Sequence, residues 1–195
     1  MVTMAGNRGV VCATDDRASR IEDMQLTAGV GPCIDAVHSG SPILVADLDH
    51  ERDIDVSRWA TFGETVRDAG VRAVFAFPLR IGAITVGAMD LYRDTVGDLS
   101  SGQMSAALLA ADAAAIALLH LDTDGDGAFE PSADTRADYR LHVHQATGMV
   151  SVQLKVPVEE ALLRLRARAF ASGQSVSEVA ADVVARRLRF DEEDS

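Results

Sequence analysis

The sequence predicts an α+β domain with a mostly antiparallel sheet, followed by a C-terminal unit of three helices. Residues 71–79 and 81–92 are rich in β-branched and aromatic side chains, which favour strands, and Arg80 should form the turn between them. The alanine-rich residues 99–121 have the composition of a helix that packs on such a sheet. Residues 139–190 divide into three helical stretches, separated by short breaks at a proline and a glycine.

Charge is unevenly distributed along the chain. Its 195 residues include 18 basic and 30 acidic ones, a formal net charge of -12. Residues 1–130 hold 9 basic and 20 acidic side chains, whereas residues 131–190 hold 9 basic and 6 acidic ones. The overall acidity argues against general binding to DNA or to anionic membranes. The three-helix unit, with its positive excess, is the region best suited to a polyanion.

The cysteine content indicates a reducing compartment. Cys12 and Cys33 are too few for a disulfide framework or a zinc site. No signal peptide precedes them, and Asp112 interrupts the apolar residues 99–121, which argues against a membrane span. We therefore expect a soluble, cytoplasmic protein without a metal site. Cys12 falls in an expected strand and should be buried. Cys33 is either a small core residue or, at a helix N-terminus, a thiol of lowered pKa.

Short strands and helices alternate in the first seventy residues. Ile21, Met24 and Leu26 should share one side of the first helix. Ser57 is suited to cap the last of these helices, and Gly70 to end it. The expected elements are, in order, a β-hairpin of residues 2–5 and 9–13, a helix at 17–26, a helix starting at Pro32, a strand at 43–45 and a helix at 57–69.

Three segments of this region together resemble a GAF domain of the kind found in actinobacterial sensory regulators. They read GVGPCIDAVHSG, ILVADL and GVRAVFAFPLRIGAITVGAMDLYR, and the resemblance covers residues 1–121. It implies a sensor domain, whose small-molecule ligand the sequence leaves unknown. Family members usually begin with a helix before the first strand. Here the first strand begins at Val2, so we expect a GAF domain without that helix.

Residues 122–135 form an acidic linker that partly matches a calcium-binding loop. Asp122, Asp124 and Asp126 with Gly127 fit the first half of the EF-hand pattern. The twelfth position, which normally supplies a bidentate glutamate, is Ala133. Because the strongest ligand is absent, we expect a solvated linker without calcium.

The first helix of the C-terminal unit carries three stripes of side chains. One, with Val143, Ala146 and Val150, should contact the other two helices. A third stripe, which includes Thr147, should face solvent. The second stripe is partly apolar and is the candidate seam of a homodimer, made of Leu141, Gln145, Gly148 and Val152.

The second and third helices are equally amphipathic. The second should begin at Pro157, and its Arg164 and Arg168 lie one turn apart, where they can grip a phosphate. Alternatively, Arg164 forms an exposed ion pair with Glu160. A capping box from Ser175 to Glu178 opens the third helix. The side chains expected to be buried are Val158, Ala161, Leu162, Leu165, Ala169, Val176, Val179, Ala180 and Val183.

The segment HQATGMVSVQLKVPVEEALLRLRARAF, followed by SVSEVAADVV, resembles an ANTAR domain, the RNA-binding module of bacterial antitermination regulators. Many family members have a lysine where this chain has Thr147. The resemblance implies a dimer that binds paired stem-loops in nascent leader mRNA, so that a terminator hairpin cannot form. The matched positions are Gln145, Ala146, Gly148, Glu160, Ala161, Leu165, Arg166, Ala169, Val179 and Ala180.

RNA is read mainly in single-stranded loops and along backbone phosphates, by basic and flat polar side chains. The candidates for this role in the three-helix unit are Arg140, His144, Lys155, Arg164, Arg166 and Arg168. The two resemblances divide the chain into a GAF-like domain at residues 1–121, a linker at 122–135, an ANTAR-like domain at 136–190 and an acidic tail at 191–195.

Two other classes of function compete with the RNA-binding regulator. Some GAF folds are methionine sulfoxide reductases that use a set of cysteines, but two cysteines without the wider motif argue against an enzyme. The second is a dimerisation or protein-interaction module that does not bind RNA. Thr147 and the acidic overall charge favour this alternative.

Overall fold

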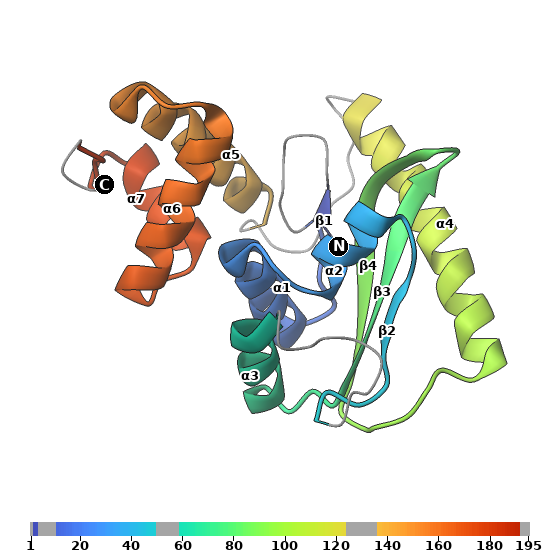
Figure 1. Ribbon diagram of the computed structural model, residues 1–195. Helices are drawn as coiled ribbons and strands as arrows, with labels where there is room; N and C mark the ends of the chain where they lie inside the picture. Colours follow the sequence, from blue (N-terminus) through green and yellow to red (C-terminus); the bar gives the residue numbers. More distant parts are fainter. Residues whose placement is uncertain (1, 4–10, 50–58, 124–135, 192–195) are drawn as a thin grey trace.

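The computed structural model describes residues 2–3, 11–49, 59–123 and 136–191. It contains an N-terminal domain with a sheet and four helices, and a C-terminal bundle of three helices that lies beside α1 (Figure 1). The elements are β1 Val2–Thr3, α1 Asp16–Ala28, α2 Pro32–Ser39, β2 Ile43–Val45, α3 Ala60–Asp68, β3 Ala73–Ile81, β4 Ile84–Arg93, α4 Ser101–Thr123, α5 Arg136–Leu154, α6 Val158–Ser172 and α7 Val176–Val184.

The four strands form one sheet in the order β1-β4-β3-β2, and every neighbouring pair is antiparallel. This confirms the predicted α+β class and the two long strands. The predicted turn at Arg80 was wrong, since Arg80 pairs with Thr85 inside the β3–β4 ladder. The turn consists of Gly82 and Ala83, and Gly82 has a φ of 60°, which glycine adopts without steric cost.

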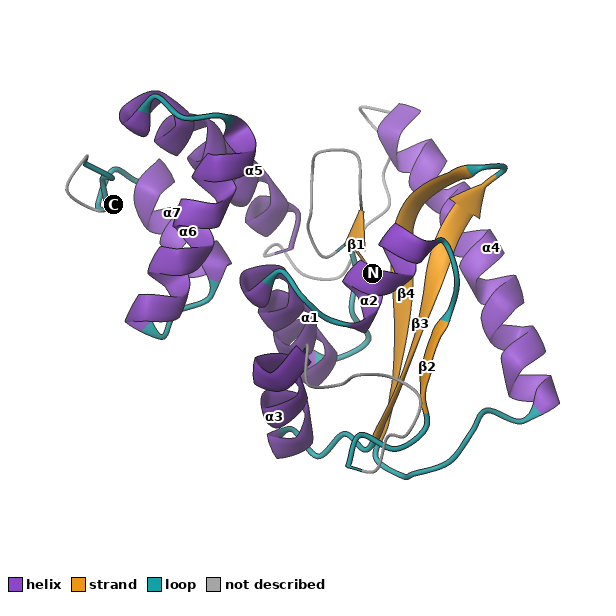
Figure 2. Ribbon diagram, viewed as in Figure 1, coloured by secondary structure: helices purple, strands orange, loops and turns teal. Residues whose placement is uncertain are grey.

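Helices cover both faces of the sheet (Figure 2). On one face, Phe75, Phe77 and Leu79 of β3 pack against the small alanines of α4. On the other face, Val74 joins a cluster with Trp59 of the α3 N-terminus and neighbouring helical side chains. The side chains of β3 alternate between these clusters because successive residues of a strand point to opposite faces. The sheet is therefore buried on both sides, and α1, α2 and α3 share the face opposite α4.

Two N-terminal predictions need correction. Residues 11–13, part of the second strand of the predicted hairpin, form no strand. Residues 4–10, which include the predicted turn, lie outside the described residues. The helix predicted from residue 57 begins at Ala60, with Trp59 at the N-cap position, so Ser57 is not the cap. Burial of Trp59 fixes the start of α3. This side chain is enclosed in the core, and its indole nitrogen donates to Asp35 Oδ2 at 2.9 Å.

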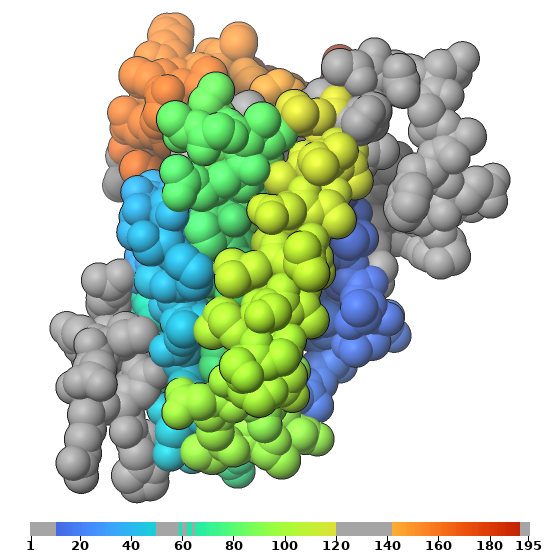
Figure 3. Space-filling model, turned by 90° about the vertical axis from the view of Figure 1, so that its right-hand side faces the viewer, coloured from blue at the N-terminus to red at the C-terminus, as the bar shows by residue number. Residues whose placement is uncertain are grey.

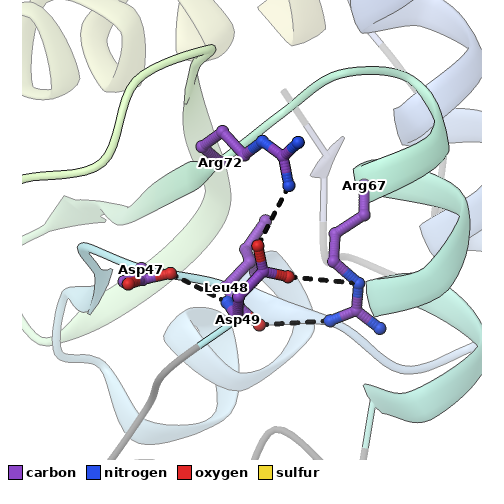
Figure 4. Close-up of polar contacts among 5 residues, drawn as sticks. All are labelled: Asp47, Leu48, Asp49, Arg67 and Arg72. Carbon is purple, nitrogen blue, oxygen red and sulfur yellow. Dashed lines mark hydrogen bonds and ion pairs between the residues drawn. The ribbon is translucent and has the colours of Figure 1, made fainter.

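One end of the sheet is held by a polar cluster that involves two arginines (Figure 4). Arg72 Nη1 lies 3.0 Å from Asp49 Oδ2, and Arg67 Nη1 donates to the Leu48 carbonyl at 3.1 Å. The backbone nitrogen of Asp49 donates to Asp47 Oδ1 at 2.9 Å. These contacts link α3 to the segment after β2. Arg67 and Arg72 therefore have structural roles in the N-terminal domain.

The helix α4 lies along one face of the molecule, and most of its surface is open to solvent (Figure 3). Leu109 and Ile116 are among its exposed apolar side chains. Among the described residues, one helical stretch, Ser101–Leu119, has the length and the apolar composition needed to cross a membrane. In the structure this stretch packs through its alanines on the sheet.

The C-terminal bundle has an apolar core that largely follows the predicted pattern. Its helices end and begin at the expected breaks, and Ser175 and Glu178 form the predicted capping box. Val158 was predicted to be buried but is exposed, because α6 begins only at this residue. The core consists of Leu26, Val143, Ala146, Val150, Ala161, Leu165, Ala169, Val176, Val179, Ala180, Val183 and Phe190.

Leu26 comes from α1 and not from the bundle, which corrects the prediction that Ile21, Met24 and Leu26 share one side. Ile21 packs in the N-terminal domain with Trp59, whereas Leu26 is buried among the side chains of the bundle. Five residues correspond to well over one turn of an α-helix, so the two side chains point in different directions. The helix α1 therefore connects the two cores.

Candidate functional site

A cluster of polar side chains is buried between α1 and β4. Glu22 and Gln25 lie one turn apart on α1, and Asp90 and Tyr92 lie two residues apart on β4, so each pair projects from one side of its element. Cys33 of α2 completes the cluster. Glu22, Gln25 and Cys33 are 2%, 0% and 1% exposed, values that are unusual for a carboxylate and an amide.

Gln25 is the centre of this hydrogen-bond network. Its Nε2 donates to Asp90 Oδ2 at 2.6 Å and lies 3.4 Å from Glu22 Oε2 and 3.2 Å from the Tyr92 hydroxyl. Its Oε1 accepts from the backbone nitrogen of Cys33 at 3.2 Å. The Tyr92 hydroxyl donates to Glu22 Oε1 at 2.7 Å and lies 3.1 Å from Asp90 Oδ2. One amide thus joins α1, α2 and β4.

The backbone at Gly31 allows Gln25 to reach Cys33. Gly31 has a φ of 148° at the N-cap of α2, and a Cβ atom at this position would clash with the Gln25 side chain. Only glycine combines this conformation with so close an approach. The glycine is therefore needed both for the turn and for the hydrogen bond to Cys33.

Burial dominates the electrostatics of the cluster. Burial and the neighbouring Glu22 together raise the pKa of the Asp90 carboxyl to about 8, against the opposite effect of hydrogen bonds from Gln25 and Tyr92. Burial also raises the pKa of the Cys33 thiol and of the Tyr92 phenol well above their ordinary values, with Asp90 and Glu22 adding to both. Asp90 is therefore mostly neutral at pH 7.

A cavity of about 600 Å³ opens beside the cluster. Glu22, Asp90 and Tyr92 form part of its wall, together with Arg17 of α1 and the segment before this helix. The wall also includes Cys12, so the cavity offers acidic, basic and thiol groups to a small molecule. The lining residues come mainly from α1, β4 and residues 12–15, so the cavity lies between α1 and β4.

The two cysteines differ from the sequence predictions in opposite ways. Cys33 is buried, as the core interpretation predicts, and burial raises the pKa of its thiol, the direction opposite to the lowered pKa of the alternative. Cys12 was predicted to be buried in a strand, but it is exposed and lies in no strand. The apolar residues around Cys12 suggested a strand, but the segment leads into the N-cap of α1 at Asp15.

The predicted RNA-binding residues are spread over the bundle. His144 on α5, Lys155 between α5 and α6, and Arg168 on α6 are exposed. Arg164 forms the alternative ion pair, with its Nη2 3.1 Å from Glu160 Oε1. The side chain of Arg140 lies outside the described residues. Thr147 was predicted to face solvent, but it is buried, and its hydroxyl donates to the Val143 carbonyl at 2.6 Å.

Arg166 is separated from this group and points to the N-terminal domain. Its Nε donates to the Leu26 carbonyl at the end of α1, at 2.9 Å, and its guanidinium lies against Gly29. A cation at the C-terminus of a helix is stabilised by the helix dipole. Close by, the backbone nitrogen of Val176 donates to Thr27 Oγ1 at 3.0 Å. The structure thus places Arg166 at the contact between the two domains.

The predicted dimer seam lies on an open side of α5. Gln145 and Gly148 are exposed, and Val152 is 79% exposed, a high value for an apolar side chain. The side chain of Leu141 is not described. A Cβ atom added at Gly148 would meet nothing within 4 Å, so this helix face has space for a neighbouring backbone.

Most of the partial match to a calcium-binding loop lies outside the described residues. Asp122 belongs to the end of α4, and Asp124, Asp126 and Gly127 lie outside the described residues.

Sequence reasoning did not identify Glu22, Gln25, Asp90 or Tyr92. Two signals were present. Asp90 and Tyr92 are the polar residues of one face of an otherwise apolar strand, and Glu22 and Gln25 share a helix side that a sheet-packed helix would bury. Neither signal says which strand and which helix meet.

The comparisons with known proteins concern the N-terminal domain. A model of the GAF domain matches residues 3–118, which leaves the bundle outside the match. Among solved structures, one domain of a two-component sensor histidine kinase protein from Sinorhizobium meliloti 1021 is similar, with a TM-score of 0.37 and 19% sequence identity. The similarity covers 43% of this chain and 54% of that one. A comparison with curated proteins gives no match.

Proposed function

The chain belongs to the GAF domain family, a family of sensor and small-molecule-binding domains, and we propose that it is an RNA-binding regulator of transcription antitermination. In this proposal the N-terminal domain receives a signal and the three-helix bundle binds paired stem-loops in nascent leader mRNA. The protein acts in the cytoplasm as a homodimer and has no catalytic role. The observation that carries the proposal is the bundle: six positions of the ANTAR resemblance form its core.

Six positions of the ANTAR resemblance have a structural role in the bundle. Small or apolar side chains recur at the matched positions because three short helices pack closely only around such residues. All six are fully buried, and they come from all three helices, namely Ala146, Ala161, Leu165, Ala169, Val179 and Ala180. This close-packed core supports the proposal.

The surface of the bundle supplies groups suited to RNA. His144, Lys155 and Arg168 are exposed, and Arg164 forms an ion pair with Glu160 on the surface. Surface ion pairs contribute little to stability, so Arg164 can exchange Glu160 for a phosphate at small cost. With so few basic groups the affinity for RNA should be moderate and salt-dependent.

The contact between the domains supports a regulatory role for the N-terminal domain. Leu26 of α1 is buried among side chains of the bundle. In addition, Arg166 and Val176 of the bundle form hydrogen bonds with the end of α1. Arg166 is therefore held at α1 by its hydrogen bond to the Leu26 carbonyl. A ligand that moves α1 would release Arg166 and would change how the bundle meets RNA or its partner copy.

A gel shift with a leader RNA of two adjacent hairpins tests the proposal. The double variant Arg164→Ala with Arg168→Ala should keep its helicity and lose the shift. The double variant Arg20→Ala with Arg80→Ala is the matched control, because both arginines are exposed in the N-terminal domain and the same charge is removed. Equal binding by wild type and both variants would place any RNA site elsewhere.

The alternative is an interaction module that does not bind RNA. The engagement of Arg164 with Glu160 and of Arg166 with α1 favours it, since these candidate residues already have partners within the chain. This alternative predicts no shift with any leader RNA. It also predicts that sedimentation of the full chain still shows a dimer, weakened by Val152→Glu at the exposed seam.

A further inference from the structure

Glu22, Cys33 and Asp90 lie far apart in the sequence and meet between α1, α2 and β4. One potential ligand atom from each, a carboxylate oxygen or the thiol sulfur, lies within 4.8 Å of the other two. We propose that Glu22, Cys33 and Asp90 bind a divalent transition-metal ion, with Zn²⁺ as the best match. This site is independent of the proposed RNA binding.

The donor set selects the class of metal. Zinc binds cysteine sulfur at about 2.3 Å and carboxylate oxygen at about 2.0–2.2 Å, and it readily combines both. Magnesium and calcium prefer oxygen ligands alone, so they have no use for the sulfur of Cys33. Two carboxylates and one thiolate therefore favour zinc and its close analogue cobalt(II).

The spacing of the donors is close to what such an ion requires. Ligand atoms at about 2.0–2.3 Å from a tetrahedral ion are about 3.3–3.7 Å apart. The 4.8 Å limit of the cluster exceeds this range by about 1 Å, a difference that small side-chain rotations can supply.

A second observation points to a missing ligand. The Oδ1 atom of Asp90 is buried and has no hydrogen-bond partner among the described residues. Buried polar atoms nearly always have a partner, and an exception calls for a specific explanation such as an ion. The other oxygen, Oδ2, accepts from Gln25 and lies near the Tyr92 hydroxyl. A metal at Oδ1 would complete the carboxylate.

The surrounding residues hold the ligands as an outer shell does in metal sites. Gln25 fixes Asp90 through Oδ2, and Tyr92 fixes Glu22 through Oε1, so both carboxylates are held in place near Cys33. Partners of this kind determine ligand orientation, and losing one typically weakens metal affinity about 10–100-fold. Gln25 also holds the start of α2, which carries Cys33.

The neighbouring cavity provides access for an ion and room for a fourth ligand. Glu22 and Asp90 form part of the wall of the 600 Å³ cavity, whereas Cys33 is not part of it. An ion would therefore enter from the carboxylate side and meet the sulfur at the closed end. Three protein ligands and one position open to water or a small molecule are typical of zinc sites that are not purely structural.

Cobalt(II) is the direct probe, since a thiolate ligand gives it an intense near-ultraviolet charge-transfer absorption. The full chain, stripped with a chelator, should bind one Co²⁺ per chain with this absorption and release it when Zn²⁺ is added. Cys33→Ser should abolish the absorption, and the matched variant Cys12→Ser should retain it. Asp90→Asn should weaken Zn²⁺ binding in calorimetry by at least about 10-fold.

Several results would overturn the site. These are saturable binding without a thiolate band in the wild type, no saturable binding, or a band that survives Cys33→Ser and disappears in Cys12→Ser. Circular dichroism checks that each variant is folded. If Cys33→Ser does not fold, the wild-type spectrum and Asp90→Asn decide the question. Mg²⁺ in excess should not displace Co²⁺, and displacement would contradict the role of the sulfur.

Discussion

The two domains treat charged side chains in opposite ways. The N-terminal domain buries Glu22 and Gln25 and half-buries Asp90 between a helix and a sheet, and it keeps several of its arginines in structural contacts. The bundle instead has a core of apolar side chains and leaves most of its basic groups at the surface. A buried polar cluster beside a cavity suits recognition of an ion or a small molecule. An apolar core under a basic surface suits contact with a polyanion.

The stability of the bundle should depend most strongly on its central leucine. Leu165 is fully buried among all three helices, so Leu165→Ala should lower the free energy of unfolding by about 2–5 kcal/mol through a cavity. Leu163→Ala, on the same helix but 61% exposed, should change it by less than about 0.5 kcal/mol. Urea unfolding followed by circular dichroism measures both, and equal losses would contradict the assigned core.

The polar cluster should depend on the backbone at Gly31. Gly31→Ala forces a side chain into a φ of 148° and against Gln25, and it should cost about 1–3 kcal/mol. The control Gly102→Ala, in α4 with open space around it, should be stabilising by about 0.5–1 kcal/mol. Thermal unfolding of both variants checks this. A neutral Gly31→Ala would mean that Gln25 does not hold the cluster together.

The buried carboxyl of Asp90 should make stability fall as pH rises. Its folded pKa of about 8 exceeds the ordinary value of 3.8, so between these values the folded chain binds a proton that the unfolded chain has lost. This stabilisation is complete below pH 3.8 and is lost as pH rises through about 8. The slope is at most about 1.4 kcal/mol per pH unit.

The comparison variant is Asp90→Asn in the presence of a chelator. The unfolding free energies of both proteins are measured in urea at several pH values. The value for the variant should increase relative to that of the wild type as pH rises from 4 to 8. Parallel pH dependences for the two proteins would show that Asp90 does not carry the titration.

The smallest effect is expected at the surface of the bundle. Arg164 and Glu160 form an exposed pair one turn apart, and such pairs contribute about 0.3–0.5 kcal/mol. A double-mutant cycle with Arg164→Ala and Glu160→Ala, measured by urea unfolding at low salt, should give this coupling energy. A coupling above about 1 kcal/mol would mean that Arg164 is structural and poorly suited to exchange its partner for a phosphate.

The sequence predicted the elements of the fold better than their meeting points. The strands around Pro78, the long α4 and the three bundle helices follow from periodicity, because apolar spacing reports which side of an element is buried. Thr147 shows the limit: its place on the helix was known, but a hydroxyl that bonds its own backbone can be buried without other partners.

The candidate metal site could not be predicted in the same way. Glu22, Cys33 and Asp90 are separated by 11 and 57 positions, which fits no local ligand spacing. Their meeting depends on β4 lying beside α1 and α2, a feature of tertiary structure. Similarly, Arg166 was a candidate for RNA binding because it is a basic residue at a matched position of the ANTAR resemblance. Its contact with Leu26 depends on how the two domains pack, which the sequence does not show.

The salt dependence of RNA affinity tests the central claim most directly. Fluorescence anisotropy of a labelled two-hairpin leader RNA gives the slope of log affinity against log salt concentration for the full chain. If Arg164 and Arg168 neutralise phosphates, their joint replacement by alanine should reduce this slope by about 1.4–1.8, that is about 0.7–0.9 for each lost contact. An unchanged slope, with RNA still bound, would contradict the proposed RNA-binding surface.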